Sequence, residues 1–218
     1  GDVAAARRHA ERALALNPRL NWASTAVLQL QSAAKDWNAA TATLVQQTKS
    51  GLIPQAEGLR KQAAMLAAEA LQLEDSDKPR ALEFALRAHK LDPALVPAAL
   101  VAARVLITQA STRKASKMLK ETWILSPHPD LADVQAHLIP GDGPDARLDR
   151  VRDLLKEARV REDGGGLEGA VALARAAIRA QRWDMARDAL KPGGILAVWS
   201  AGPDPAFRKR LHDTGLDV

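Results

Sequence analysis

Apolar residues recur every three or four positions along most of the chain, and this spacing is typical of one buried face on an α-helix. Four segments carry such a stripe: residues 21–34, 59–73, 96–108 and 167–180. In the last of them the stripe consists of Leu167, Ala170, Leu173, Ala174 and Ala177. The pattern predicts a chain that is helical almost throughout.

A second set of segments alternates with these four and shares one internal spacing. Three of them place an alanine twelve residues before a proline, and a fourth places it fourteen residues before one. With a fifth copy near the C-terminus, the aligned alanines are Ala6, Ala40, Ala81, Ala115 and Ala186. The step is 34 residues from the first to the second and from the third to the fourth, and 41 residues between the second and third. A recurring period of this length predicts stacked helix pairs.

Each aligned alanine is followed four positions later by another small or apolar residue: Ala10, Leu44, Ala85, Leu119 and Leu190. Residues four apart share a helix face, and a small side chain there lets a neighbouring helix approach closely. Three of these segments end on a Leu-x-Pro sequence. In those, Asn17, Asp92 and Ser126 are expected to cap the following helix, with proline at its first position.

A helix pair that recurs every 34 residues with this alanine spacing resembles the tetratricopeptide repeat. The small residue expected midway through the first helix is present as Ala103 and Ala174, whereas Leu28 and Glu69 depart from it. The expected fold class is therefore all-α, a tetratricopeptide-like helical-repeat solenoid of antiparallel helix pairs with a short irregular or strand-containing C-terminal tail. An irregular helical bundle is the alternative.

The period predicts four parts along the chain. Degenerate helical repeats occupy residues 1–126, and residues 127–166 form an inter-repeat insertion with a short helix, a Pro/Gly turn and one amphipathic helix from about Asp145. The last helix pair occupies residues 167–190, and an atypical tail occupies residues 191–218.

The order of these parts resembles the repeat region of the HemY family, the membrane-anchored haem-biosynthesis-associated proteins of proteobacteria. The resemblance runs over most of residues 1–190 and rests on the degenerate repeats followed by HPDLA, PGDGPDARLDRVRDLL and ALARAAIRAQRWDMARDAL. It implies a role beside the late haem-biosynthesis enzymes, on the cytoplasmic side of the inner membrane, where it would organise them or handle their product. Family members carry an N-terminal membrane segment that this chain lacks, so membrane attachment is expected only through such a segment.

Composition and charge narrow the function classes. Cysteine is absent, which excludes disulfides, thiolate zinc sites and cysteine nucleophiles. The 31 basic and 26 acidic residues give a net charge of +5, but both signs are scattered along the helices instead of forming a basic stripe with interleaved aromatics. The sequence therefore predicts a solvated helical surface and no nucleic-acid partner.

No motif in the sequence predicts catalysis, a metal site or a cofactor. Gly164, Gly166 and Gly169 fit the spacing of a dinucleotide-binding turn, but EARVRED precedes them where a buried strand is needed, so a linker is expected. The five histidines include no pair at helical spacing and no surrounding carboxylates, and His128 is expected in a structured turn. Ser200 has no matching histidine and acid.

The tail resembles the closing strand, helix and strand of class I methyltransferase-like folds, particularly the spermidine synthase-like branch. In LKPGGILAVWSAGPDPAFRKRLHDTGLDV, Lys191 ends a helix, ILAVWS forms a strand, and Asp204 with Pro205 caps an amphipathic turn that carries Phe207 and Leu211. The cofactor-binding half is missing, because only helical residues separate the glycines from Lys191. The tail is expected to bind neither S-adenosylmethionine nor a nucleotide.

The sequence favours a non-enzymatic scaffold whose concave groove binds another protein or an extended peptide, with no cofactor. Two alternatives stay open: a fragment of an S-adenosylmethionine-type transferase with a helical extension, and a porphyrin-binding module. The repeat register predicts eight groove residues: Trp22, Thr25, Gln29, Leu66, Leu100, Arg104, Val171 and Arg175.

Overall fold

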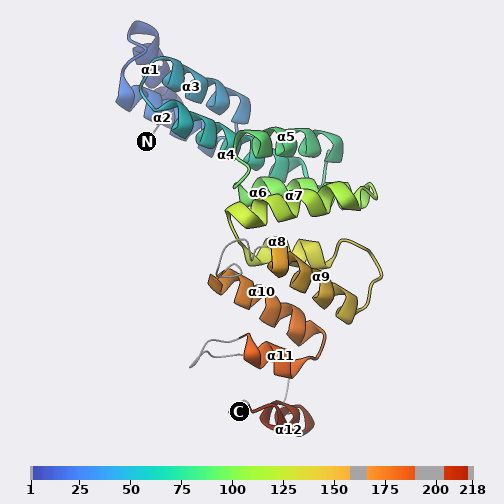
Figure 1. The fold of residues 1–218 in the computed structure, drawn as a ribbon. Helices are drawn as coiled ribbons and strands as arrows, with labels where there is room; N and C mark the ends of the chain where they lie inside the picture. Colours follow the sequence, from blue (N-terminus) through green and yellow to red (C-terminus); the bar gives the residue numbers. More distant parts are fainter. Residues whose placement is uncertain (1, 158–165, 190–203, 216–218) are drawn as a thin grey trace. The chain divides into compact units, whose positions relative to one another are not determined.

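The computed structural model describes residues 2–157, 166–189 and 204–215, and these residues form twelve helices and no strand (Figure 1). The all-α prediction is therefore confirmed, whereas the strand predicted at ILAVWS lies outside the described residues. Among the described helices, none is both long enough and apolar enough to cross a bilayer. The chain divides into two compact units, residues 1–109 and residues 110–218, called unit 1 and unit 2 below.

Unit 1 is a series of helices joined by connections of three to five residues. Its helices are α1 (Val3–Leu16), α2 (Asn21–Ala33), α3 (Trp37–Lys49), α4 (Gln55–Leu73), α5 (Lys78–Leu91) and α6 (Val96–Thr108). Each helix packs against the next, and α4 also packs against α6. Short connections between neighbouring helices give the antiparallel pairing that the repeat period predicts.

Unit 2 continues the same pattern of packing. Its described helices are α7 (Thr112–Leu125), α8 (Pro129–Ala136), α9 (Pro144–Glu157), α10 (Gly166–Arg179), α11 (Trp183–Asp188) and α12 (Pro205–Asp213). Helix α8 packs against α9 and α10, and α9 packs against α10 in turn. The segment expected as an insertion thus supplies a helix pair that takes part in the packing of its neighbours.

The aligned alanines explain how closely these helices pack. Ala40, Ala81, Ala115 and Ala186 are all fully buried. The residue four positions after each of the first three is also fully buried. Because a methyl group is the whole side chain, a neighbouring backbone can approach at each of these positions. Ala6 differs, because it is itself exposed, although Ala10 four positions later is buried.

Capping residues fix where several helices begin. Asp36, Asp77 and Asp204 each accept a hydrogen bond from the backbone N–H three residues later, at distances of 3.3, 3.2 and 2.9 Å. The cap predicted at Asp204 is therefore confirmed. Such caps satisfy backbone donors that the first helical turn leaves unpaired.

The caps predicted within the Leu-x-Pro sequences are wrong. Asn17 and Asp92 end α1 and α5, and their side chains accept from Arg19 and Ala94 in the connecting turn. Leu20 and Leu95 are the residues that precede α2 and α6. Asparagine and aspartate stabilise such turns by bonding the backbone two residues on, and this local bond competes with capping. Ser126 likewise ends α7, and His128 precedes α8.

Helix α12 packs on α11 at the end of unit 2. The rings of Trp183 and Phe207 meet edge to face, with centroids 5.0 Å apart, and Leu211 is buried. Arg187 of α11 also donates to the carbonyl oxygen of Thr214. These contacts place the predicted Phe207 and Leu211 face against the last helix pair.

Candidate functional site

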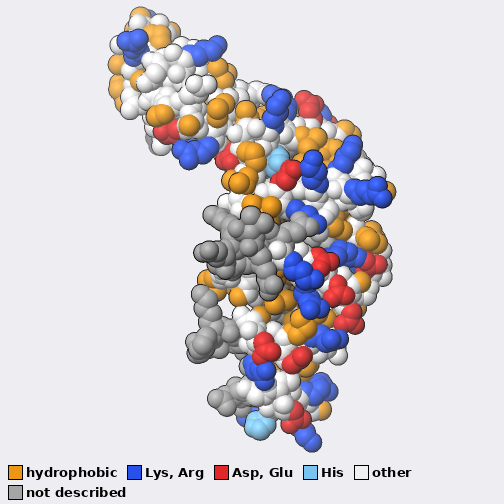
Figure 2. All heavy atoms as spheres, in the orientation of Figure 1, with side chains coloured by type: hydrophobic (Ala, Val, Ile, Leu, Met, Phe, Trp, Pro, Cys, Tyr) orange, Lys and Arg blue, Asp and Glu red, His pale blue; other side chains and the backbone are white. Residues whose placement is uncertain are grey.

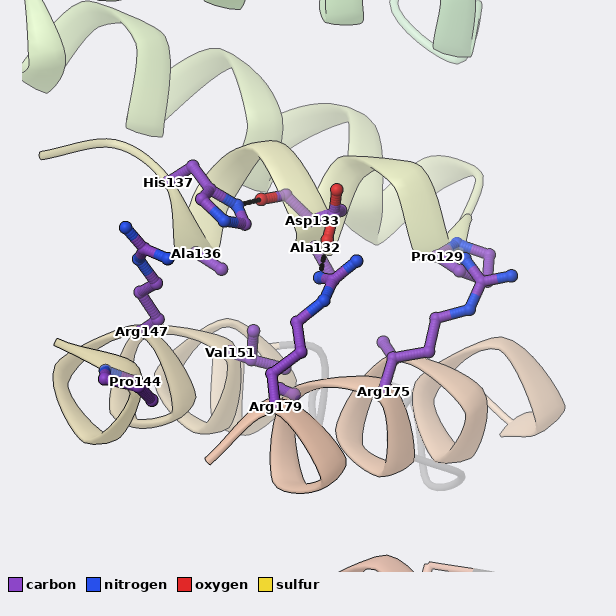
Figure 3. Close-up of a pocket in the computed structure, with 12 residues that line it drawn as sticks. Pro129, Ala132, Asp133, Ala136, His137, Pro144, Arg147, Val151, Arg175 and Arg179 are labelled. Atoms are coloured by element: carbon purple, nitrogen blue, oxygen red, sulfur yellow. Dashed lines mark hydrogen bonds and ion pairs between the residues drawn. The ribbon is translucent and has the colours of Figure 1, made fainter. Parts of the chain in front are cut away.

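A pocket of about 380 Å³ lies between α8, α9 and α10, wholly within unit 2 (Figure 3). We call it the α8–α10 pocket. Small apolar side chains make up much of its lining, namely Ala132, Ala136, Val151, Ala172 and Ala176. The charged and polar side chains that line it are Asp133, His137, Arg147, Arg175 and Arg179. A pocket of this size is large enough for a small ligand or a few side chains of a partner.

The pocket forms where the repeat register places an arginine instead of an alanine. In α9, Val151 and Leu154 are buried four and seven positions after Arg147, as Ala85 and Ala88 are after Ala81. Arg147 therefore occupies the position of an aligned alanine. A guanidinium cannot enter the tight contact that a methyl group makes, and the facing side chains are mostly alanines. We infer that this mismatch in size keeps the space open.

Ion pairs connect α8 to α10 beside the pocket. Oδ1 of Asp130 lies 3.7 Å from Nη1 of Arg175. Asp133 accepts a hydrogen bond from Arg179 (Figure 3). All four side chains are well exposed, so water screens both pairs and each stabilises the fold only weakly. Such pairs can exchange partners when another carboxylate approaches.

Arg147 is the pocket arginine without a partner among the described residues. Its Nε atom is buried and makes no hydrogen bond. The neighbouring Arg150 differs, because it pairs with Asp142 and donates to the carbonyl oxygen of Ala136. The pocket therefore holds a cation that is partly removed from water and is not compensated by the described part of the chain.

The lining as a whole is basic. Three arginines and one carboxylate, that of Asp133, line the pocket. Asp130 beside the pocket pairs with Arg175, which leaves the positive charge of Arg147 without a paired carboxylate among the described residues. The space-filling view shows acidic and basic side chains interspersed over the presented face, as the scattered charges of the sequence predict (Figure 2). The pocket is thus a local departure from a mixed surface, and it favours anionic groups.

The two histidines of α8 have structural roles. His128 precedes the helix, and its Nδ1 accepts from the backbone N–H of Asp130 at 3.2 Å. His137 ends the helix, and its Nδ1 donates to the carbonyl oxygen of Asp133 at 2.8 Å, since a carbonyl can only accept. No group of three potential metal ligands occurs among the described histidines and carboxylates.

The glycine motif lies at the start of a helix. Gly166 begins α10 with a φ of 59°, and Gly169 is buried within that helix. Gly164 lies outside the described residues. The described element before this segment is the helix α9, whereas a dinucleotide site needs a strand there.

The predicted groove residues of unit 1 fall into different environments. Trp22, Thr25 and Gln29 are exposed along one face of α2. On α6, Leu100 is half-buried, and Arg104 makes a bidentate ion pair with Glu74 at 2.5 and 2.7 Å. Of these five residues, the three on α2 present free surface to a partner.

Leu66 corrects one part of the predicted groove. Its side chain is buried in a core cluster with Ala67, Ala88 and Ala98, where Phe84 packs against them. Residues of α5 and α6 cover the face of α4 that carries Leu66, since Ala88 lies on α5 and Ala98 lies on α6. Leu66 therefore stabilises the fold and is not accessible.

In unit 2, the structure brings one predicted residue into the pocket. Arg175 lines it, whereas Val171 is half-buried on the same helix and does not. The sequence interpretation missed Asp133, Arg147 and Arg179. The available signal was the register, since an arginine at an alanine position breaks the pattern of the repeat.

Comparisons with known proteins show similarity to a curated protein and to solved structures. No protein-family model matches the chain. The probable magnetosome protein Mms48 of Magnetospirillum gryphiswaldense is 28% identical over 171 residues, which cover 78% of this chain and 36% of that protein. The chain thus spans about a third of the length of this relative.

Among solved structures, a thermophilic TPR protein of Thermus thermophilus is similar at 23% sequence identity. The match covers 82% of this chain and 92% of that one, with a TM-score of 0.37. The helix packing within each unit therefore carries the assignment of the fold.

Proposed function

We propose that this chain belongs to a non-enzymatic helical-repeat scaffold that binds a partner protein, and that the α8–α10 pocket is one of its binding sites. The observation that carries the proposal is the uncompensated Arg147 in a basic, alanine-lined pocket between successive helix pairs. Helical repeats use the surfaces of consecutive helices in this way to bind extended partners.

The chemistry of the lining supports binding over catalysis. The twelve residues that line the pocket include no serine, threonine, cysteine or lysine that could act as a nucleophile. Asp133 accepts from Arg179, and His137 donates to a backbone carbonyl, so neither is arranged as a general base beside a nucleophile. What the pocket offers is positive charge and small apolar surface.

The exposed face of α2 is proposed as a second contact surface, independent of the pocket. Trp22 is 62% exposed, and Thr25 and Gln29 lie along the helix from it. Tryptophan contributes more than most residues to the energy of protein interfaces, because it buries a large rigid surface. Leu100 and Arg104 on α6 of unit 1 are proposed as further contact positions. Val171 on α10 of unit 2 is proposed as another.

The partner is proposed to be a late haem-biosynthesis enzyme at the bacterial inner membrane. The order of segments shared with the HemY family supports this proposal, and membrane attachment would come from a segment outside this chain. The relative named as a probable magnetosome protein favours a second assembly, in which the same scaffold binds a magnetosome component.

The test is titration calorimetry of the full chain with each purified late haem-biosynthesis enzyme and with purified magnetosome components. Saturable binding to a member of either set supports the scaffold and selects the assembly. Absence of binding to every one of these proteins refutes it. Haem is titrated alone in parallel, and a saturable change in its absorbance would favour the porphyrin-binding alternative.

A further inference from the structure

The geometry points to one chemistry for the occupant: we propose that the α8–α10 pocket binds an acidic, extended segment of the partner protein, whose carboxylate pairs with Arg147. This inference rests on the proposed scaffold function and specifies what the partner must present.

Arg147 supplies the anchor. Its Nε is buried without an acceptor, so the guanidinium has lost part of its hydration and has gained no partner within the described chain. A carboxylate in the pocket would compensate that charge through the part of the guanidinium that lines the cavity. Lysine would not serve equally well, because its ammonium is a compact point charge without a planar fork.

The ion pairs of α8 and α10 determine which arginine is available first. Arg175 and Arg179 already face Asp130 and Asp133, whereas Arg147 faces no described carboxylate. An incoming carboxylate therefore meets Arg147 without displacing anything. A second carboxylate would compete with Asp133 for Arg179, since that pair is exposed and weak.

The spacing of the pocket cations favours an extended chain. Arg175 and Arg179 lie four residues apart on one helix face, which corresponds to a rise of about 6 Å. Alternate side chains of an extended strand repeat at about 6.6 Å and point to the same side. Glutamates at alternate positions can therefore follow these arginines, while the small apolar lining accommodates the backbone between them.

The direct test uses a fluorescein-labelled peptide of alternating glutamate and threonine, with a glutamine-threonine peptide as the uncharged control. Binding to the full chain is followed by fluorescence anisotropy. Saturable binding of the glutamate peptide, and none of the control, is expected. Equal binding of both peptides, or of neither, overturns the inference.

Paired variants then locate the site. Arg147→Gln is expected to raise the Kd for the glutamate peptide about tenfold, the scale of a lost charge-assisted pair. Arg152→Gln is the matched control, because Arg152 lies on the same helix, is exposed, and pairs with Asp149 outside the pocket lining. If both variants weaken binding equally, the peptide senses only net charge, and the inference is wrong.

A second pair of variants does not depend on removing the half-buried Arg147. Asp133→Asn releases Arg179 and is expected to lower the Kd several-fold, whereas Asp149→Asn, which removes the same charge from an exposed site, leaves it nearly unchanged. A Kd that rises or stays constant in Asp133→Asn overturns the proposed competition. Glutarate at the same carboxylate concentration should compete poorly with the peptide; equal competition would mean that the pocket binds free anions and not a chain segment.

The scaffold and the acidic segment can fail separately. If a partner protein binds the wild-type chain and Arg147→Gln leaves that binding unchanged, the acidic-segment inference falls and the scaffold function stands. If no partner protein binds the wild-type chain but the peptide binds with the expected variant pattern, the scaffold function falls and the pocket chemistry stands.

Discussion

Arg147 illustrates how a single residue can oppose the stability of the element that carries it. At the equivalent position in the repeat, four other helices have a buried alanine. In three of these helices the residue four positions after the alanine is fully buried as well. A half-buried cation without an acceptor costs free energy of folding, because part of its hydration is lost. A residue that lowers the stability of its own helix in this way is typical of a binding position.

We therefore predict that Arg147→Met stabilises the chain by about 1 kcal/mol, since methionine keeps much of the length of the side chain without the charge. Thermal unfolding followed by circular dichroism measures the change. Arg152→Met serves as control and should leave the melting temperature almost unaltered, because Arg152 is exposed and weakly paired. A lower melting temperature for Arg147→Met would show that the guanidinium stabilises the folded chain.

Glu69 is a second residue that lowers the stability of the folded chain. It is 8% exposed on α4, and burial raises its pKa above the ordinary value, while Arg80 and Arg87 of α5 lower it and Glu83 raises it. A pKa that is higher in the folded state means that folding favours the protonated form. Stability therefore falls as the pH rises through the raised pKa, and it recovers in acid.

Glu69→Gln should accordingly unfold at a higher urea concentration than the parent chain at pH 7. The advantage should shrink as the pH falls, and it should vanish below the ordinary carboxyl pKa, where both states of the parent are protonated. Urea titrations at several pH values provide the measurement, with Glu57→Gln on the same helix as the comparison. An advantage that is independent of pH would mean that packing, not protonation, causes the effect.

At the scale of the element, helix ends are marked by residues in the left-handed region. Lys35 and Gln181 follow α2 and α10 with φ values of 57° and 55°, and Gly51 follows α3 with a φ of 74°. In each case the next residue donates its backbone N–H to the carbonyl five positions earlier, as from Asp36 to Gln31 at 2.9 Å. This arrangement satisfies carbonyls at the end of a helix, and glycine is the residue that adopts it with least strain.

Replacement of Lys35 by glycine is predicted to stabilise unit 1 by about 1 kcal/mol, because glycine has no Cβ to crowd the carbonyl in the left-handed region. Chemical denaturation of the full chain gives the difference. Lys35→Ala separates the backbone effect from the loss of the side chain, and it should be close to neutral. Equal gains in both variants would contradict this explanation.

The elements themselves were largely predictable from the sequence, and the pocket was not. The aligned alanines identified α3, α5, α7 and α11 because a buried small residue repeats with the helical period. Arg147 breaks this pattern, but an arginine beside other charged residues is most simply interpreted as solvated. Its environment depends on Ala136 and Arg179, which belong to other helices. Leu66 was misplaced because periodicity defines a face but not which neighbour covers it.

At the scale of the whole molecule, unit 1 has a hydrophobic core of its own, which an independent domain needs. Its core residues include Val27, Leu44, Leu66 and Val101, which come from four different helices. Nearest-neighbour packing distributes the stability of a repeat array over successive interfaces. A fragment that ends at a unit boundary keeps the interfaces within that unit.

A fragment of residues 1–109 should therefore fold alone, with strong helical circular dichroism and a cooperative thermal transition, although at a lower melting temperature than the full chain. A fragment of residues 1–91, which lacks α6, provides the comparison, because α6 packs against both α4 and α5. It should lose much of its cooperativity. A non-cooperative transition in the longer fragment would show that unit 1 is not an independent folding unit.

The packing of unit 1 joins helices that are adjacent or next but one in the chain. Contacts of such short sequence separation cost little loop entropy and form quickly. During synthesis, each new helix thus finds its partners among residues that have just left the ribosome. The nascent chain can complete unit 1 before the arginines of the pocket have emerged, so the basic cavity forms late, when half of the chain has already folded.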